Sequence, residues 1–232
     1  MSQLAPEIPE PETATRQRLA SALSEMVAHP EYPCLGARSV FHRDRATVKV
    51  YDELAGDGVA EQLLADLRTF AAETDPEEGF ASFVATFRGP SVLDEQHFER
   101  LLWSQLEQVH SADDAGWNTA VSADPSDQHF AFSAGGTAYF IVGLHPRASR
   151  DARRTPTPTL VFNLHEQFEA LRASGRFPRM RDKIRERDHH LQGSINPMVA
   201  DHGETSEARQ YSGRQVEPAW QAPFCPKHQE HS

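Results

Sequence analysis

The sequence contains little cysteine and no long apolar run. Its 232 residues include two cysteines, Cys34 and Cys225, too few for the disulfide framework of a small secreted domain. No stretch approaches the roughly 18 consecutive apolar residues that a membrane-spanning helix needs. The first residues are rich in Pro and Glu and lack the basic and then apolar pattern of a signal peptide. These absences predict a cytoplasmic protein.

Positive charge is also scarce. Lys and Arg number 23 against 34 Asp and Glu, so the formal net charge is −11. Nucleic acids and anionic membranes both require a basic surface, and we expect neither as a partner. The segment from Arg147 to Arg187 is an exception because it is rich in arginine. It indicates either a site for a specific anionic group, such as a carboxylate or propionate, or a solvated face of ion pairs.

Apolar periodicity predicts one domain of mixed α+β class, with residues 1–14 as a disordered tail, 15–225 as the domain and 226–232 as a second tail. The expected helices are residues 16–28, 58–73, 94–110, 166–174 and 180–191. The expected strands are residues 47–51, 80–87, 129–133, 137–144 and 159–163. Gly135 and Gly136 separate two of these strands, which predicts a central hairpin in a mostly antiparallel sheet. Beyond Gln192 the chain is irregular, and Trp220 and Phe224 indicate that this segment docks on the domain.

Motifs for nucleotide chemistry are missing. The sequence has neither a P-loop nor a Rossmann glycine pattern, and no serine stands in a nucleophile elbow. Three other groups of residues are candidates for a functional site.

The first candidate group follows the most apolar strand. His145 ends this strand, and Arg150, Arg153 and Arg154 lie in the next loop. An imidazole in this position can ligate a metal or act as an acid or base. Guanidinium groups bind anions through charge-assisted, bidentate hydrogen bonds. The alternative is a structural histidine beside a surface arginine cluster.

The second candidate is Cys34, in the turn Tyr32-Pro33-Cys34-Leu35-Gly36. A thiolate at neutral pH needs positive surroundings or oriented amide groups. Gly36 allows close approach of the backbone, and Arg38 supplies a nearby charge. The alternative is a buried, inert cysteine in a turn.

The third candidate group lies where the strand ending at Asn163 gives way to a helix. Here His165, together with Glu166 or Glu169, could bind a cationic substrate, since strand ends often carry functional polar groups. The alternative is that Asn163 caps the helix and the acids stabilise its N-terminal dipole.

In their order along the chain, these segments resemble the YqcI/YcgG family. The resemblance covers about residues 30 to 225. It is carried by Pro33-Cys34, the loop at 143–154, the junction at 163–169, Arg185…Asp188, the segment 206–211 and Trp220…Phe224. Similar family members include haem proteins that N-hydroxylate the guanidino group of arginine, or of an arginine-derived amino acid, in natural-product biosynthesis.

The resemblance implies haem b (iron protoporphyrin IX) as the cofactor. It implies His145 as the axial ligand, with Cys34 as the alternative and His165 as a third choice. Glu166 or Glu169 would pair with the substrate guanidinium. The arginines of the loop, Arg150, Arg153 and Arg154, would hold the propionates or the carboxylate of the substrate.

The same resemblance implies an oxygenase that uses O₂. No segment resembles a flavin or iron–sulfur module, so electrons would come from an external donor protein. Three alternatives stay open: a haem oxygenase acting on another amine, a non-catalytic haem-binding sensor, and a haem-free scaffold or metal-binding protein. The sequence makes no prediction of the oligomeric state.

Overall fold

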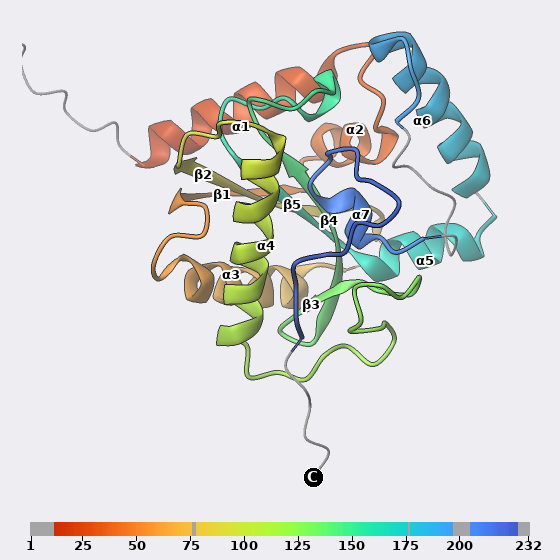
Figure 1. The fold of residues 1–232 in the computed structure, drawn as a ribbon. Coiled ribbons are helices and arrows are strands. Elements are labelled where there is room, and N and C mark those ends of the chain that lie inside the picture. The colour runs from red at the N-terminus through yellow and green to blue at the C-terminus, as the bar shows by residue number, and fades with distance from the viewer. Residues whose placement is uncertain (1–11, 76–77, 176, 197–204, 227–232) are drawn as a thin grey trace, which may run out of the picture.

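A five-stranded sheet forms the centre of the part of the chain that the computed structural model describes, residues 12–75, 78–175, 177–196 and 205–226 (Figure 1). The strands are β1 (Ala46–Glu53), β2 (Ser82–Gly89), β3 (Phe132–Ala134), β4 (Thr137–Leu144) and β5 (Thr159–Leu164). Their order across the sheet is β1-β2-β5-β4-β3. β1 and β2 run parallel, whereas the other neighbouring strands are antiparallel. The predicted α+β class and mostly antiparallel sheet are confirmed.

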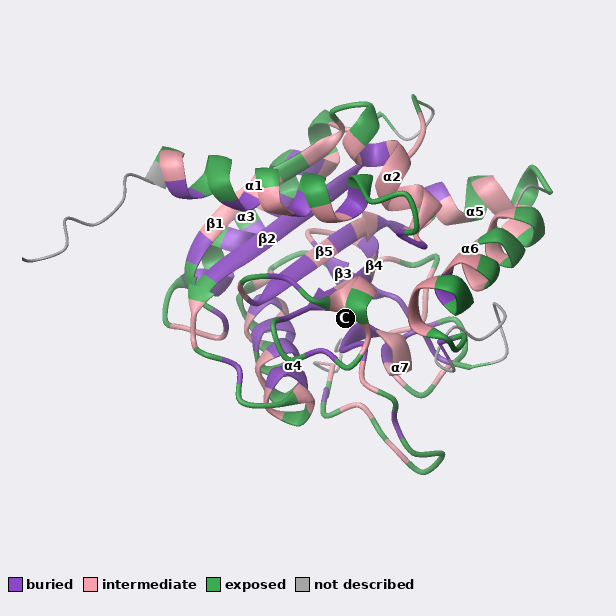
Figure 2. Cartoon of the chain, turned by 90° about the horizontal axis from the view of Figure 1, so that it is seen from above, coloured by how far each residue is buried: buried purple, intermediate pink, exposed green. Residues whose placement is uncertain are grey.

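The helices cover both faces of this sheet. They are α1 (Glu12–Ala28), α2 (Leu35–His42), α3 (Val59–Glu73), α4 (Glu95–Ala112), the 3₁₀ turn η2 (Asp151–Arg153), α5 (His165–Ala173), α6 (Phe177–Gln192) and α7 (Ala208–Tyr211). α3 and α4 pack on the face that carries the main core. α1 and α2 lie on the opposite side, while α5 and α6 extend outward beyond α2 (Figures 1 and 2).

Each of the three inner strands presents apolar side chains to both faces, because successive residues of a strand point in opposite directions. One set belongs to the main core: Phe83, Ala85, Phe87, Tyr139, Ile141, Leu160, Phe162 and Leu164. The other set lines a cavity: Ser82, Val84, Phe140, Val142, Leu144, Val161 and Asn163. Figure 2 shows these strands as largely buried. The sheet therefore separates a packed core from a cavity.

Two predicted features are corrected by the structure. The Gly135-Gly136 hairpin joins β3 and β4 as expected, but it lies at the edge of the sheet, and β5 is the central strand. Asn163 does not cap α5, because it lies within β5, where its Oδ1 accepts a hydrogen bond from Ser82 Oγ at 2.7 Å. Leu164 is the N-cap residue of α5 and makes no side-chain capping bond.

The ends of the domain also differ from the prediction in detail. α1 begins at Glu12, so residues 12–14 are helical and do not belong to a tail. The rest of the predicted N-terminal tail, and residues 227–232, lie outside the described residues. The expected docking of the C-terminal segment is confirmed: the rings of Trp220 and Phe224 lie 6.2 and 6.0 Å from that of Trp103.

α7 lies along the part of β4 that β3 leaves uncovered. β3 pairs with Thr137–Tyr139 only, so the remainder of β4 is an edge that needs cover. Gly143 makes the close approach possible. A Cβ atom at this position would lie 2.6 Å from Phe98 Cε1 and 2.7 Å from the carbonyl oxygen of Tyr211. Only a residue without a side chain lets α4 and α7 both contact this strand.

Among the described residues, no helix is long and apolar enough to cross a membrane.

We predict that Gly143→Ala lowers the free energy of unfolding by about 1–3 kcal/mol, because the added methyl group overpacks the junction of α4, α7 and β4. Gly36→Ala is the matched control, since its Cβ would meet only Cys34 Sγ at an ordinary contact distance of 3.9 Å. In helix α2 this change should be neutral or stabilising by up to about 1 kcal/mol. Urea unfolding curves measure the stability of the two variants. Equal free energies of unfolding would contradict the close packing described around Gly143.

Candidate functional site

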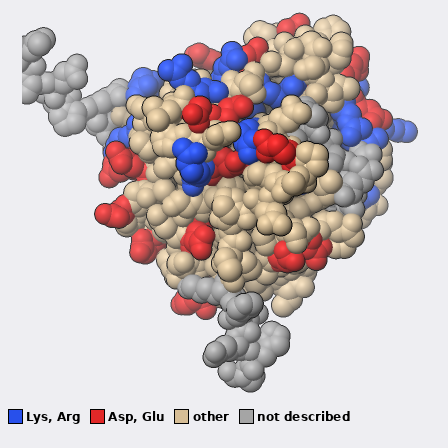
Figure 3. All heavy atoms as spheres, viewed as in Figure 1, with Lys and Arg blue, Asp and Glu red and all other residues tan. Residues whose placement is uncertain are grey.

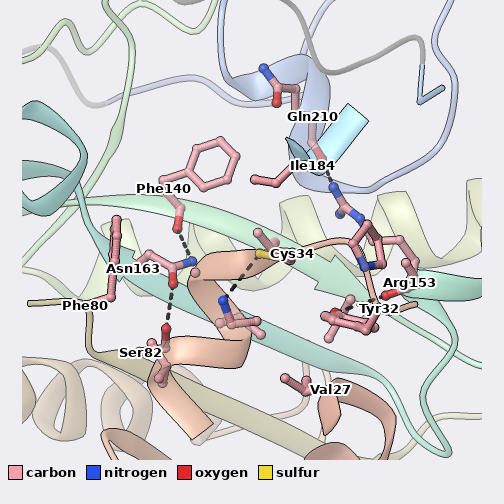
Figure 4. Close-up of a pocket in the computed structure, with 18 of the residues that line it drawn as sticks. Val27, Tyr32, Cys34, Phe80, Ser82, Phe140, Arg153, Asn163, Ile184 and Gln210 are labelled. Carbon is pink, nitrogen blue, oxygen red and sulfur yellow. Dashed lines mark hydrogen bonds between the residues drawn. The ribbon is translucent and has the colours of Figure 1, made fainter. Parts of the chain in front are cut away.

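The cavity lies between the sheet and the helices α1, α2, α5 and α6. It encloses about 280 Å³ and is lined mainly by apolar side chains. Concave, largely apolar sites with a few polar groups are the usual form of small-molecule sites. In Figure 4, Cys34 lies between two groups of lining residues. Tyr32 and Arg153 are on one side of it, and Phe80, Ser82 and Asn163 are on the other.

Cys34 is the N-cap residue of α2. Its Sγ accepts a hydrogen bond from the backbone N–H of Ala37 at 3.4 Å. Burial raises the pKa of the Cys34 thiol, while the amide groups of Ala37 and Gly36 and the guanidinium of Arg153 lower it. Burial therefore favours the protonated thiol, whereas two amide groups and one guanidinium favour the thiolate.

Arg153 is held beside Cys34 by backbone carbonyl groups. Its Nη1 donates to the carbonyl of Gly143 at 3.0 Å, and burial lowers the pKa of its guanidinium. Gly213 makes room for it: a Cβ there would lie 2.9 Å from Arg153 Nη1. None of the contacts described for Arg153 is an ion pair with a carboxylate in hydrogen-bond range. Its charge interacts with Tyr32, Cys34 and, at longer range, Asp188.

The other two predicted arginines differ from one another. Arg150 lines the cavity and pairs with Asp188 of α6 at 2.9 Å, with both side chains nearly buried. Arg154 is outside the cavity lining, where it pairs with Asp151 and donates to the carbonyl of Ala148. The structure thus brings Arg150 and Arg153 to one site and leaves Arg154 at the surface.

α6 forms an outer wall of the cavity. Its residues Met180, Ile184 and Asp188, spaced four apart, line the cavity. The Asp188–Arg150 ion pair connects this wall to the loop after β4. Arg187 of the same helix donates to the carbonyl of Tyr32 at 3.0 Å, so α6 also holds the chain just ahead of Cys34.

His145 lies on the other face of the sheet from the cavity. Leu144 lines the cavity, so the next residue points toward α4, where the imidazole stacks on Phe98 with ring centroids 4.3 Å apart. Its Nδ1 accepts a hydrogen bond from the backbone N–H of Arg147 at 3.2 Å. Burial lowers the pKa of His145 to about 4. These contacts are those of a neutral, packed histidine.

The predicted acids of α5 also lie outside the cavity lining. Glu166 is exposed, and Glu169 pairs with Arg172 on the same helix. The Nε2 atom of His165 lies 3.8 Å from Glu169 Oε1 and 3.9 Å from Glu207 Oε1. The α5 residues that line the cavity are instead Phe168 and Arg172.

Glu207 is a site residue to which sequence reasoning gave no role. It lines the cavity and is 7% exposed. Burial raises the pKa of Glu207 to about 8, although Arg172 lowers it. The segment 206–211 carries part of the family resemblance and is too polar for a core. No signal in it distinguishes Glu207 from a surface acid.

Figure 3 shows how charge is distributed on the face seen in Figure 1. Lys and Arg side chains gather in its upper part, toward α1 and α6, and acidic residues dominate below. In the described part of the chain, no group of three or more His, Cys, Asp or Glu side chains could hold a metal ion. A haem iron differs from such a centre because one axial side chain is enough to bind it.

The structure is an α+β domain with a largely apolar cavity on one face of its sheet. The chain belongs to the YqcI/YcgG family, whose profile matches residues 23–225. It is 25% identical over 215 residues to the protein named "Uncharacterized protein YqcI" of Bacillus subtilis (strain 168), covering 88% of this chain and 84% of that protein. Among solved structures no significant match is found.

We predict that His145 makes unfolding depend on pH. The native imidazole, with a pKa of about 4 against 6.5, stays neutral between these values while the unfolded state takes up a proton. The contribution of His145 to the free energy of unfolding should therefore fall as the pH drops from 6.5 toward 4, by on the order of 1 kcal/mol per pH unit. Glu207, whose native pKa is about 8, acts in the opposite direction, so the contribution of His145 is measured as the difference between the unaltered protein and a variant.

Urea unfolding at several pH values measures this slope. His145→Asn, which keeps an acceptor for the Arg147 amide, should remove the contribution of His145 from this slope. Leu144→Ala, one residue away, should lower stability at every pH and keep the slope. An unchanged slope in His145→Asn would contradict the neutral, buried imidazole.

Proposed function

We propose that this protein is a haem-dependent oxygenase that N-hydroxylates the guanidino group of arginine or an arginine-like amino acid. The observation that carries the proposal is the position of Cys34. Its thiol lines an apolar cavity at the N-terminus of α2, with Arg153 beside it. A single thiolate in such surroundings can serve as the axial ligand of a b-type haem.

The residues around Cys34 fit a haem ligand in three respects. Amide groups of the first turn of α2 face the sulfur, and such hydrogen bonds tune a metal-bound thiolate. Residue 36 is a glycine, so no side chain occupies the space 3.9 Å from the sulfur where a Cβ would lie. The valines Val84, Val142 and Val161 of the sheet offer a flat apolar wall for a macrocycle.

Among the three candidate ligands, Cys34 is the one that lines the cavity. His145 is packed against Phe98 on the other face of the sheet, and His165 is absent from the lining. We therefore assign the axial position to Cys34. Arg153 would offset the negative charge on the sulfur. Arg150, which reaches the cavity from the same loop, would bind a propionate and keep its ion pair with Asp188.

A haem bound through a thiolate supplies O₂ activation, because the thiolate donates electron density that favours O–O cleavage. In the overall reaction one oxygen atom joins the guanidino nitrogen and the other leaves as water. Two electrons and two protons balance it, with the electrons coming from an external donor protein. The apolar lining excludes water from the site, which strengthens the electrostatic contacts that orient the substrate.

We predict that the purified protein, supplied with haem precursor, shows a stoichiometric Soret band. Its ferrous CO complex should have the long-wavelength Soret band of a thiolate ligand. Cys34→Ser should abolish that band, because a hydroxyl is a poor iron ligand. Cys225→Ser is the matched control, since Cys225 is exposed, and it should leave the spectrum unchanged.

The same preparation tests turnover. With a chemical or protein reductant and O₂, L-arginine should gain one oxygen atom by mass spectrometry. A protein that takes up no haemin, or a Cys34→Ser variant that keeps the thiolate band, would overturn the assignment. A haem-loaded protein without turnover on any guanidino compound would favour the haem-binding sensor instead.

A further inference from the structure

Glu207 lies near a cation of α5 without forming a hydrogen bond to it. Arg172, the nearest cation, already pairs with Glu169, and its Nη2 lies 3.9 Å from Glu207 Oε1. At that distance the contact is an ion pair by proximity but not a hydrogen bond. Oε1 of Glu207 therefore has an ionic neighbour without a hydrogen bond to it.

Two polar atoms of this cluster have no hydrogen-bond partner among the described residues: Oε2 of Glu207 and Nε of Arg172. Both residues line the cavity. A buried polar atom without a partner is destabilising, so native proteins rarely retain one without a reason. A ligand that forms hydrogen bonds with these two atoms would remove the destabilisation when it binds.

We propose that Glu207 binds the cationic group of the substrate in this cavity. The inference rests on the proposed function, in which that group is a guanidinium, and it names the acid that recognises it. A guanidinium presents parallel N–H donors that match the two oxygens of a carboxylate. Glu207 replaces Glu166 and Glu169 in this role, since neither of these lines the cavity.

Binding through Glu207 is coupled to a proton. The distance to Arg172 alone would suggest an ionised Glu207, but burial has the larger effect and raises the pKa to about 8. The titratable groups that face Glu207 are His165, Glu169 and Arg172 of α5 and Tyr211 of α7. Tyr211, whose pKa burial raises, stays neutral.

The empty cavity then holds a neutral Glu207 at neutral pH, and the complex holds a carboxylate. A guanidinium remains charged over the whole pH range of the titration, so it binds the ionised form of Glu207. The binding constant should rise by up to about tenfold per pH unit below a pH of about 8 and level off above it. Close to one proton should leave the protein for each cation bound on the lower side of that range.

Isothermal titration calorimetry on the full-length protein tests this directly. The probes are L-arginine, agmatine, which lacks the carboxylate, and L-citrulline, a neutral isostere of arginine. Titrations in buffers of different ionisation enthalpy report the protons released. We expect L-arginine and agmatine to bind with proton release, and L-citrulline to bind at least about tenfold more weakly without it.

Glu207→Gln should abolish both the proton release and the preference for arginine over citrulline. Glu166→Gln, a matched change on an exposed side chain, should preserve both. If Glu207→Gln does not fold, the number of protons released when arginine binds to the unaltered protein still tests the inference. Equal binding of arginine and citrulline, binding without proton release, or no binding of any probe would overturn the inference.

The outcomes separate this inference from the proposed function. A protein that forms the thiolate haem complex and hydroxylates arginine, but whose Glu207→Gln variant still prefers arginine to citrulline, refutes the role of Glu207 alone. A protein that takes up no haem, yet binds arginine with proton release that depends on Glu207, supports the inference and refutes the oxygenase.

Discussion

The pairing of β4 with β5 determines which side chains face the core and which face the cavity. Ile141 pairs with Phe162 and both belong to the core, whereas Val142 pairs with Val161 and both line the cavity. Because side chains alternate, a slip of one residue would exchange the two sets. Gly143 fixes the register, since α4 and α7 tolerate no side chain at that position. The register also decides that Leu144 faces the cavity and that His145 packs against Phe98 on the other face.

Burial decides the protonation of the ionisable groups that the domain encloses. It lowers the pKa of His145 to about 4 and raises that of Glu207 to about 8, and it raises the pKa of Cys34. At neutral pH all three groups are therefore uncharged without a ligand. A metal at Cys34 or a cation at Glu207, as proposed above, would convert each group to its charged form, and binding would then be linked to the release of protons.

Periodicity predicted the elements well where they are long and amphipathic. The strand expected at residues 137–144 coincides with β4, and α3 begins one residue after its predicted start. α2 was missed, because it is short and its cap is a cysteine, which is not among the usual N-cap residues. Asn163, a common cap residue, instead completes a strand and bonds across the sheet to Ser82.

The site was predictable only in part, since it combines segments far apart in the chain. Counting alternate residues from Phe140 places His145 on the opposite face, but both faces of β4 are apolar, and the sequence did not show which one bordered a cavity. Cys34, Arg150 and Arg153 were identified from their types and neighbours. Glu207 was not, because its burial depends on α5 packing beside a segment more than thirty residues later in the chain.

The most direct test of the account is an anomalous-scattering map, recorded at the iron absorption edge, from crystals of the haem-loaded protein. The account predicts one iron peak inside the cavity, at bonding distance from Cys34 Sγ and on the opposite side of the sheet from His145. A peak bonded to His145, or one at the molecular surface, would contradict it.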